Sequence, residues 1–225
     1  MDVRPDRRPS PLREMVRFEV VHQLGRISTW VMFGLFLFPL VGVTLDDLAD
    51  AQRSEALYHS SLQVAQHGAV MGIVALLILA SVAGDAATRD IRTGLEPLVL
   101  ATPVDRLSYL GGRFLGAFAI AVLLGAAIPL AHLLVPLTQP EAGPDVLGAA
   151  HPGAYALTLV LLVLPNAFIG TAILFTLATR LRHGLGSWLG VAVIFFVAQF
   201  TQSWFGDVLG RWDLARALDP TGVNA

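Results

Sequence analysis

The stretch from Gly84 to Arg113, GDAATRDIRTGLEPLVLATPVDRLSYLGGR, is the longest polar interruption between two strongly apolar parts of the chain. It mixes charges of both signs with apolar residues at helical spacing, a pattern typical of an amphipathic segment at a membrane surface or against a partner protein. Gly94 and Pro97 disfavour one continuous helix through it. We therefore expect a helix, a break and a second helix, and we call residues 84–113 the elbow. The alternative is a solvated loop that only joins two membrane spans.

The second helix of the elbow has its own start signal. Thr102 is expected to be the N-cap, with Pro103 at the first helical position. Asp105 follows three residues after Thr102 and would complete a capping box, in which two side chains satisfy free backbone N–H groups. These residues predict that the helix begins at Pro103.

The composition of the 225-residue chain is that of a membrane protein. Hydrophobic residues make up 55% and charged residues 14%, whereas about a quarter of the residues of soluble domains are charged. The formal net charge of −2 suggests no nucleic-acid partner. Because the chain has neither cysteine nor lysine, it cannot contain a disulfide, a thiolate metal site or the lysine of a P-loop. If ATP is used, another polypeptide must hydrolyse it.

Apolar stretches that do not alternate with polar residues predict an all-α, polytopic membrane protein. Each is close to the roughly 20 residues that a helix needs to cross about 30 Å of hydrocarbon. The five stretches lie near residues 27–45, 64–83, 113–137, 153–178 and 187–205. They divide the chain into an N-terminal segment (1–26), a transmembrane domain (27–205) and a tail (206–225). Within the first segment, Leu12 to Arg26 is expected to form an interfacial helix, with a simple lead-in to the first span as the alternative.

The distribution of arginine predicts the orientation, because basic residues concentrate in cytoplasmic loops. Three arginines would lie on one side of the membrane: Arg53, Arg211 and Arg216. The other twelve would lie on the opposite side: Arg4, Arg7, Arg8, Arg13, Arg17, Arg26, Arg89, Arg92, Arg106, Arg113, Arg180 and Arg182. We therefore expect the N-terminus and the elbow to be cytoplasmic and the tail to be extracytoplasmic.

No catalytic motif of a soluble enzyme occurs in the sequence, and we expect no catalytic, cofactor-binding or metal-binding residues. No buried pair of an acid and a base is expected inside the spans. His67 and His132 lie near span ends with no carboxylate at ligand spacing, so we expect structural or interfacial roles for them. A membrane-embedded enzyme would need polar residues clustered at one depth in several spans, and none is evident.

The order of residues in and after the elbow carries a resemblance to a known family. The residues are Arg89-Asp90, Thr93-Gly94, Glu96, Leu98-Val99, Pro103-Val104, Arg106, Tyr109-Leu110 and Arg113-Phe114. This order resembles the signature region of type 2 ABC exporter permeases (ABC-2-type transporter permeases), although Pro97 stands where that pattern usually has an apolar residue. Motifs outside the elbow extend the likeness: Arg17-Phe18-Glu19-Val20, Leu164-Pro165-Asn166 and Leu218-Asp219-Pro220. They resemble the N-terminal membrane part of a bacterial permease subgroup that is fused to an aminopeptidase domain.

The resemblance implies a permease subunit of an ABC exporter in the bacterial cytoplasmic membrane. A separate ATP-binding cassette subunit would hydrolyse the ATP, and a second permease half or a second copy would complete the complex within the lipid. The residues expected to couple the permease to that subunit are Arg89, Asp90, Thr93, Gly94, Glu96, Pro103 and Arg106. Such permeases usually have six spans, so we expect this chain to be truncated before a sixth. The alternative is a non-transporting membrane scaffold or a remnant of a longer permease–peptidase protein.

Overall fold

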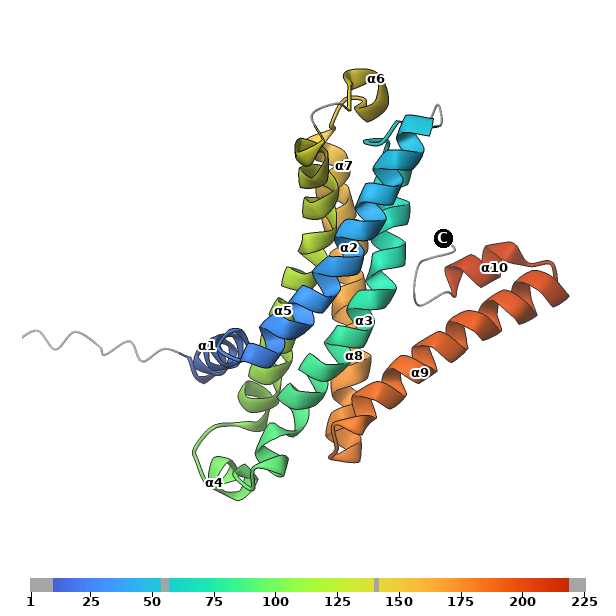
Figure 1. Ribbon diagram of the computed structural model, residues 1–225. Coiled ribbons are helices and arrows are strands. Elements are labelled where there is room, and N and C mark those ends of the chain that lie inside the picture. Colours follow the sequence, from blue (N-terminus) through green and yellow to red (C-terminus); the bar gives the residue numbers. More distant parts are fainter. Residues whose placement is uncertain (1–9, 54–56, 140–141, 219–225) are drawn as a thin grey trace, which may run out of the picture.

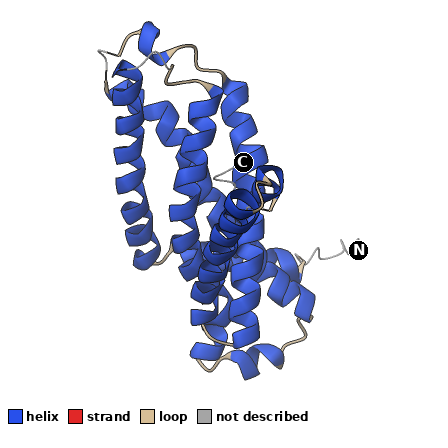
Figure 2. Cartoon of the chain, turned by 90° about the vertical axis from the view of Figure 1, so that its right-hand side faces the viewer, coloured by secondary structure: helices blue, strands red, loops and turns tan. Residues whose placement is uncertain are grey.

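The computed structural model, shown in Figure 1, describes residues 10–53, 57–139 and 142–218. Short loops join its helices, and no strand occurs among these residues (Figure 2). Five helical segments are long and apolar enough to cross a membrane. The expectation of an all-α chain with five such segments is therefore confirmed.

The helical segments follow the predicted apolar stretches and extend beyond them. The helices of the first three candidate spans are α2 (Ile27–Arg53), α3 (Ser61–Arg92) and α5 (Arg106–Leu134), and α5 continues as the 3₁₀ segment η1 (Val135–Thr138). The fourth combines α7 (Pro152–Leu157), the π-helical η2 (Thr158–Val163) and α8 (Leu164–Leu181). The fifth combines α9 (Leu185–Phe200) with the π-helical η3 (Thr201–Val208). Short helices complete the chain: α1 (Pro11–Leu24), α4 (Glu96–Leu100), α6 (Pro144–Leu147) and α10 (Trp212–Ala217).

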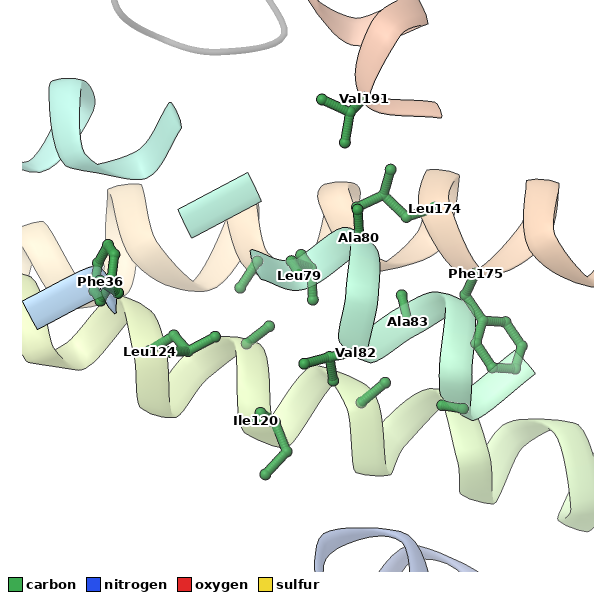
Figure 3. Packing of buried hydrophobic residues seen from close by; sticks show 14 of the residues in the cluster. Phe36, Leu79, Ala80, Val82, Ala83, Ile120, Leu124, Leu174, Phe175 and Val191 are labelled. Atoms are coloured by element: carbon green, nitrogen blue, oxygen red, sulfur yellow. The ribbon is translucent and has the colours of Figure 1, made fainter. Parts of the chain in front are cut away.

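Helix α3 lies at the centre of the bundle and packs against α2, α5, α8 and α9. Its buried residues Leu79 and Val82 belong to one apolar core together with Leu124 of α5 and Leu174 of α8 (Figure 3). Alanine is frequent on the buried faces, and Ala80 is fully buried. Small side chains let helix backbones approach closely, which is how helices commonly pack where lipid provides no hydrophobic driving force.

Helix α1 lies across the long helices rather than parallel to them (Figure 1). Ser10 caps it by accepting a hydrogen bond from the backbone N–H of Arg13. It packs on α5 at Gly112 and Gly116, where an added Cβ would collide with Met15 and Glu19 respectively. The predicted N-terminal helix is therefore present, and the two glycines hold it close to α5.

Helices α8 and α9 form a tight hairpin, from which α9 leans away from the bundle (Figure 1). Arg182 makes the turn in the left-handed conformation, with φ of 53°. The outer face of α9 carries large exposed apolar residues, including Phe196 at 70% exposure. The chain then folds back so that the ring of Trp212, at the start of α10, packs on Gly206. The Asp219-Pro220 part of the Leu218-Asp219-Pro220 motif lies outside the described residues.

The predicted capping box at Thr102 is wrong. Helix α5 begins at Arg106 rather than at Pro103, and its N-cap is Asp105, whose carboxylate accepts a 2.9 Å hydrogen bond from the backbone N–H of Ser108. Hydrogen bonds from Ser108 hold the pKa of Asp105 below its usual value. The hydroxyl of Thr102 instead donates to the carbonyl of Val99, 2.6 Å away, in the last turn of α4. Thr102 does not cap α5 because the helix begins at Arg106, so the residue that flanks its first turn is Asp105.

The elbow and the α8–α9 turn lie at one end of the bundle, which we call the elbow end, and α6 lies at the opposite end (Figure 1). This arrangement makes the predicted orientation testable. His183 is exposed in the α8–α9 turn, and nothing lies within 4 Å of the position where a Cβ would be added to Gly143, next to α6.

We predict that Gly143→Cys reacts with a membrane-impermeant thiol reagent in intact cells, whereas His183→Cys reacts only after the membrane is permeabilised. The physical reason is the arginine bias, which retains the elbow end in the cytoplasm. The native chain contributes no background because it has no cysteine. The reverse labelling pattern would show that the elbow faces away from the cytoplasm.

Candidate functional site

A buried cluster of charged side chains, which we call the charge network, ties α1 and α5 to the last turns of α3. Glu19 of α1 is fully buried, and its two carboxylate oxygens accept hydrogen bonds of 2.7 and 2.9 Å from the guanidinium of Arg89. Gln23, one turn later on α1, donates to the same carboxylate at 2.9 Å. A two-point contact between guanidinium and carboxylate fixes orientation as well as distance, so it sets the angle of α1 against α3.

Asp85 is the second acidic centre of the charge network. It accepts hydrogen bonds from Arg89, one turn later on α3, at 2.7 and 3.0 Å. Arg92 binds its other oxygen at 2.6 Å, and Arg26, between α1 and α2, lies 2.5 Å away. Three arginines therefore surround one largely buried carboxylate, and they connect α3 to the start of α2.

Asp90 and Arg113 make the third contact of the charge network, between α3 and α5. Arg113 pairs with Asp90 and donates to the backbone carbonyl of Ala86 at 2.8 Å. The hydroxyl of Tyr109 donates to the same Asp90 oxygen at 2.6 Å. Burying these charges is costly unless nearly every polar atom has a partner, and here almost all do. The Nε of Arg113 is the exception among the charge network's side chains described by the structure.

The expectation that no buried acid–base pair occurs in the spans is wrong. Helix α3 does not end with its apolar stretch near residue 83 but continues to Arg92, so Asp85, Arg89 and Asp90 remain helical and turn toward α1 and α5. The spacing of Asp85 and Arg89, four residues apart, was a visible signal for such a helix. Glu19, the other partner of Arg89, is 70 residues away in the sequence, and no spacing pattern predicted this contact.

Residues 93–105, which we call the connecting segment, contain four of the five remaining predicted site residues, and the fifth, Arg106, is the first residue of α5. Gly94 ends α3 with φ of 71°, a conformation that favours glycine, and the backbone N–H of Leu95 donates back to the carbonyl of Asp90 at 2.9 Å. The hydroxyl of Thr93 donates to the carbonyl of Arg89 at 2.9 Å. The break predicted at Gly94 is therefore confirmed, and it has the hydrogen bonding of a glycine-terminated helix.

Helix α4 in the connecting segment presents a mixed surface. Glu96, its first residue, pairs with Arg182 of the α8–α9 turn at 2.5 Å. Leu98 is 67% exposed, and Pro103 and Arg106 are also exposed. Of the seven predicted coupling residues, the structure thus places Arg89 and Asp90 in the interior, where they hold helices together. Thr93 and Gly94 form the break, and Glu96, Pro103 and Arg106 lie at or near the surface.

A cleft of about 510 Å³ opens beside the charge network, between α2, α3 and the α8–α9 turn. The charged part of its lining includes Arg26, Asp85, Arg92 and Arg182, and the apolar part includes Met32 and Trp188. The volume is in the range of small-molecule sites, and the lining suits a molecule with one anionic and one apolar part.

At the end opposite the elbow, the expectation that the histidines lack a carboxylate partner is wrong. The Nδ1 of His67 lies 2.6 Å from Oδ2 of Asp47. The signal was hard to see in the sequence, because Asp47 and His67 are 20 positions apart and belong to different helices, α2 and α3. His132 of α5 joins the same cluster, with its ring centroid 5.3 Å from that of His67.

Comparison of the chain with protein-family models, curated proteins and solved structures finds no match. We therefore interpret the site from its own geometry, together with the resemblance of its motifs.

Proposed function

We propose that the chain is the permease subunit of an ABC exporter in a bacterial cytoplasmic membrane, driven by ATP hydrolysis on a separate ATP-binding cassette subunit. The observation that carries this proposal is the connecting segment, which is exposed on its outer side and attached to several helices on its inner side. The residue order of the elbow, which resembles type 2 ABC exporter permeases, supports the same function.

The attachments of the connecting segment suggest how a push on α4 would spread through the bundle. The segment is covalently continuous with α3 and α5, and Glu96 joins it to the α8–α9 turn through Arg182. Where α3 and α5 approach the segment, the charge network joins them to each other and to α1. A displacement of α4 would therefore reach α1, α3, α5 and the α8–α9 turn together, as coupling to a moving ATPase requires.

This geometry suggests different roles for exposed and buried residues. Two exposed coupling residues, Pro103 and Arg106, would contact the ATPase together with Leu98, which is exposed on α4. Arg89 and Asp90 would instead transmit motion from within the charge network, where their side chains are already paired. The cleft beside the network is the candidate surface for the substrate, and the apolar outer face of α9 would contact lipid, a second copy or another permease half.

The proposal predicts that an ATP-binding cassette subunit co-purifies with the tagged chain from membranes of its own host, as identified by mass spectrometry. Leu98→Arg should reduce the recovered subunit at least tenfold, because about 1.4 kcal/mol of binding is a factor of ten and buried interface anchors commonly contribute more. Leu137→Arg is the matched control, since Leu137 is 77% exposed at the opposite end and should leave recovery unchanged.

Two outcomes would contradict the proposal. One is the absence of any ATP-binding cassette subunit from the wild-type preparation. The other is equal recovery of that subunit with the wild-type chain, Leu98→Arg and Leu137→Arg. A complex that forms normally, but whose ATP hydrolysis is the same with and without this chain, would instead favour a non-transporting scaffold.

A further inference from the structure

Polar side chains from three helices meet near the end of the bundle opposite the elbow. Asp47 comes from α2, His67 from α3 and His132 from α5, and one potential ligand atom of each lies within 4.8 Å of the others. His132 is fully buried, the side chain of His67 is 1% exposed, and that of Asp47 is 25% exposed. The group, which we call the His–Asp cluster, is therefore enclosed on the protein side and reachable past Asp47.

The contacts of His67 are compatible with the tautomer that a metal ligand requires. The hydroxyl of Thr44 donates its single proton to the carbonyl of Leu40 at 2.7 Å. The same oxygen lies 3.3 Å from Nε2 of His67, and it can accept a hydrogen bond from that nitrogen when Nε2 carries the ring proton. In the neutral ring Nδ1 then has a lone pair, and it faces a carboxylate oxygen of Asp47 at 2.6 Å. A ring nitrogen and a carboxylate oxygen that both carry lone pairs repel each other at this distance unless a cation, either a proton or a metal ion, lies between them.

His132 presents a second free lone pair. Its Nε2 lies 3.0 Å from the backbone carbonyl of Tyr58, and because a carbonyl only accepts, the proton must be on Nε2. Its Nδ1 is buried and has no hydrogen-bond partner among the described residues. The ring cannot easily turn to find one, because it stacks on the Tyr58 ring at 4.1 Å, and the Tyr58 hydroxyl donates to the backbone carbonyl of His132 at 3.0 Å.

We propose that Asp47, His67 and His132 form a binding site for a divalent transition-metal ion, with Zn²⁺ as the best fit. Two imidazole nitrogens and one carboxylate oxygen are a ligand set that zinc uses, and three protein ligands leave one position for water or another ligand. Thr44 and the Tyr58 carbonyl supply the outer hydrogen bonds that orient ligating histidines. In a tetrahedral zinc site with bonds of about 2.1 Å, ligand atoms lie about 3.4 Å apart. The potential ligand atoms in the structure lie between 2.6 Å and at most 4.8 Å from one another, a range that includes this value.

An ordinary ion pair is the competing explanation. A doubly protonated His67 would also account for its 2.6 Å contact with Asp47. It would not account for the buried Nδ1 of His132, which would remain without a partner at a cost of about 1–3 kcal/mol. A metal ion satisfies both histidines at once, and this site does not depend on the proposed transport function.

The test measures metal binding directly, on the full chain purified in detergent with a tag that contains no histidine. After removal of metal by a chelator, Zn²⁺ is titrated calorimetrically, and Co²⁺ is used to give a visible spectrum. We expect one ion per chain. Because the chain has no cysteine, no thiolate ligand can contribute. His67→Asn and His132→Asn should each weaken binding at least tenfold, and His151→Asn, an exposed histidine at the same end, should leave it unchanged.

A stability measurement accompanies the titration. Zn²⁺ should raise the melting temperature of the wild-type chain and of His151→Asn, but not that of His132→Asn. If His132→Asn does not fold, Asp47→Asn provides the same comparison, because its side chain is nearly the same size and partly exposed. The proposal is overturned if the wild-type chain binds no ion, if all variants bind equally, or if Zn²⁺ leaves the wild-type melting temperature unchanged. In that case Asp47 and His67 form an ion pair only.

Discussion

Replacing Glu19 by leucine is expected to lower the free energy of unfolding by about 3 kcal/mol, because removing one partner of a buried ion pair leaves the other charge uncompensated. The value lies at the lower end of the usual range because Arg89 would keep its contacts with Asp85. Gln23 would also lose its acceptor on Glu19. The melting temperature of the full chain in a mild detergent measures the effect.

Two further variants show whether the burial of the charge network is responsible. Glu96→Gln breaks the ion pair with Arg182, whose side chain is 61% exposed, and should cost at most about 1 kcal/mol. The double variant Glu19→Leu/Arg89→Met should recover part of the loss, because replacing both partners by apolar groups removes the unpaired charge. Equal effects of Glu19→Leu and Glu96→Gln would show that the charge network contributes little to stability.

The second large effect is expected at the crossing of α8 and α9. A Cβ added to Gly186 would lie 2.6 Å from the carbonyl oxygen of Leu177 and 2.8 Å from Cα of Ala178. These are backbone atoms, so they cannot turn away as a side chain could, and the two helices must separate. We expect Gly186→Ala to destabilise the chain by about 1–3 kcal/mol, the usual range for overpacking.

Gly34→Ala is the matched control for this close approach. Gly34 also lies within a long helix, but nothing is within 4 Å of its added Cβ. Alanine there should stabilise the chain by roughly 0.5–1 kcal/mol, since glycine is the less favourable residue in a helix. The two substitutions therefore have opposite expected signs in the same melting experiment. A stabilising effect of Gly186→Ala would contradict the close crossing of α8 and α9.

The candidate spans could be predicted from sequence because apolar length is a local property that the thickness of a membrane imposes. The end of α3 could not. Charges after residue 83 were interpreted as part of the elbow, yet α3 continues to Arg92, since Glu19 and Arg113 supply partners that let Arg89 and Asp90 be buried. The break at Gly94 was predicted because left-handed backbone favours glycine whatever surrounds it.

The contacts that make up the two candidate sites depend on packing between distant segments. Arg89 meets Glu19 because α1 crosses α5 at Gly112 and Gly116. Their four-residue spacing permits close packing of some helix, but it does not say that α1 is that helix. The His–Asp cluster likewise draws on three separate helices. The exposed residues of the connecting segment were easier to identify, since their place between two spans already implied that they lie at one end of the bundle.

Arg182 has an energetic consequence for the α8–α9 turn. Its left-handed backbone costs roughly 1–2 kcal/mol for a residue with a Cβ, and glycine would relieve that strain. Glycine would also remove the guanidinium that pairs with Glu96 at 2.5 Å. Backbone energy and side-chain pairing thus oppose each other at one residue. The α8–α9 turn is therefore strained at the residue that links it to α4. A movement of α4 that breaks the Arg182–Glu96 pair would remove the ion pair that offsets part of this backbone strain.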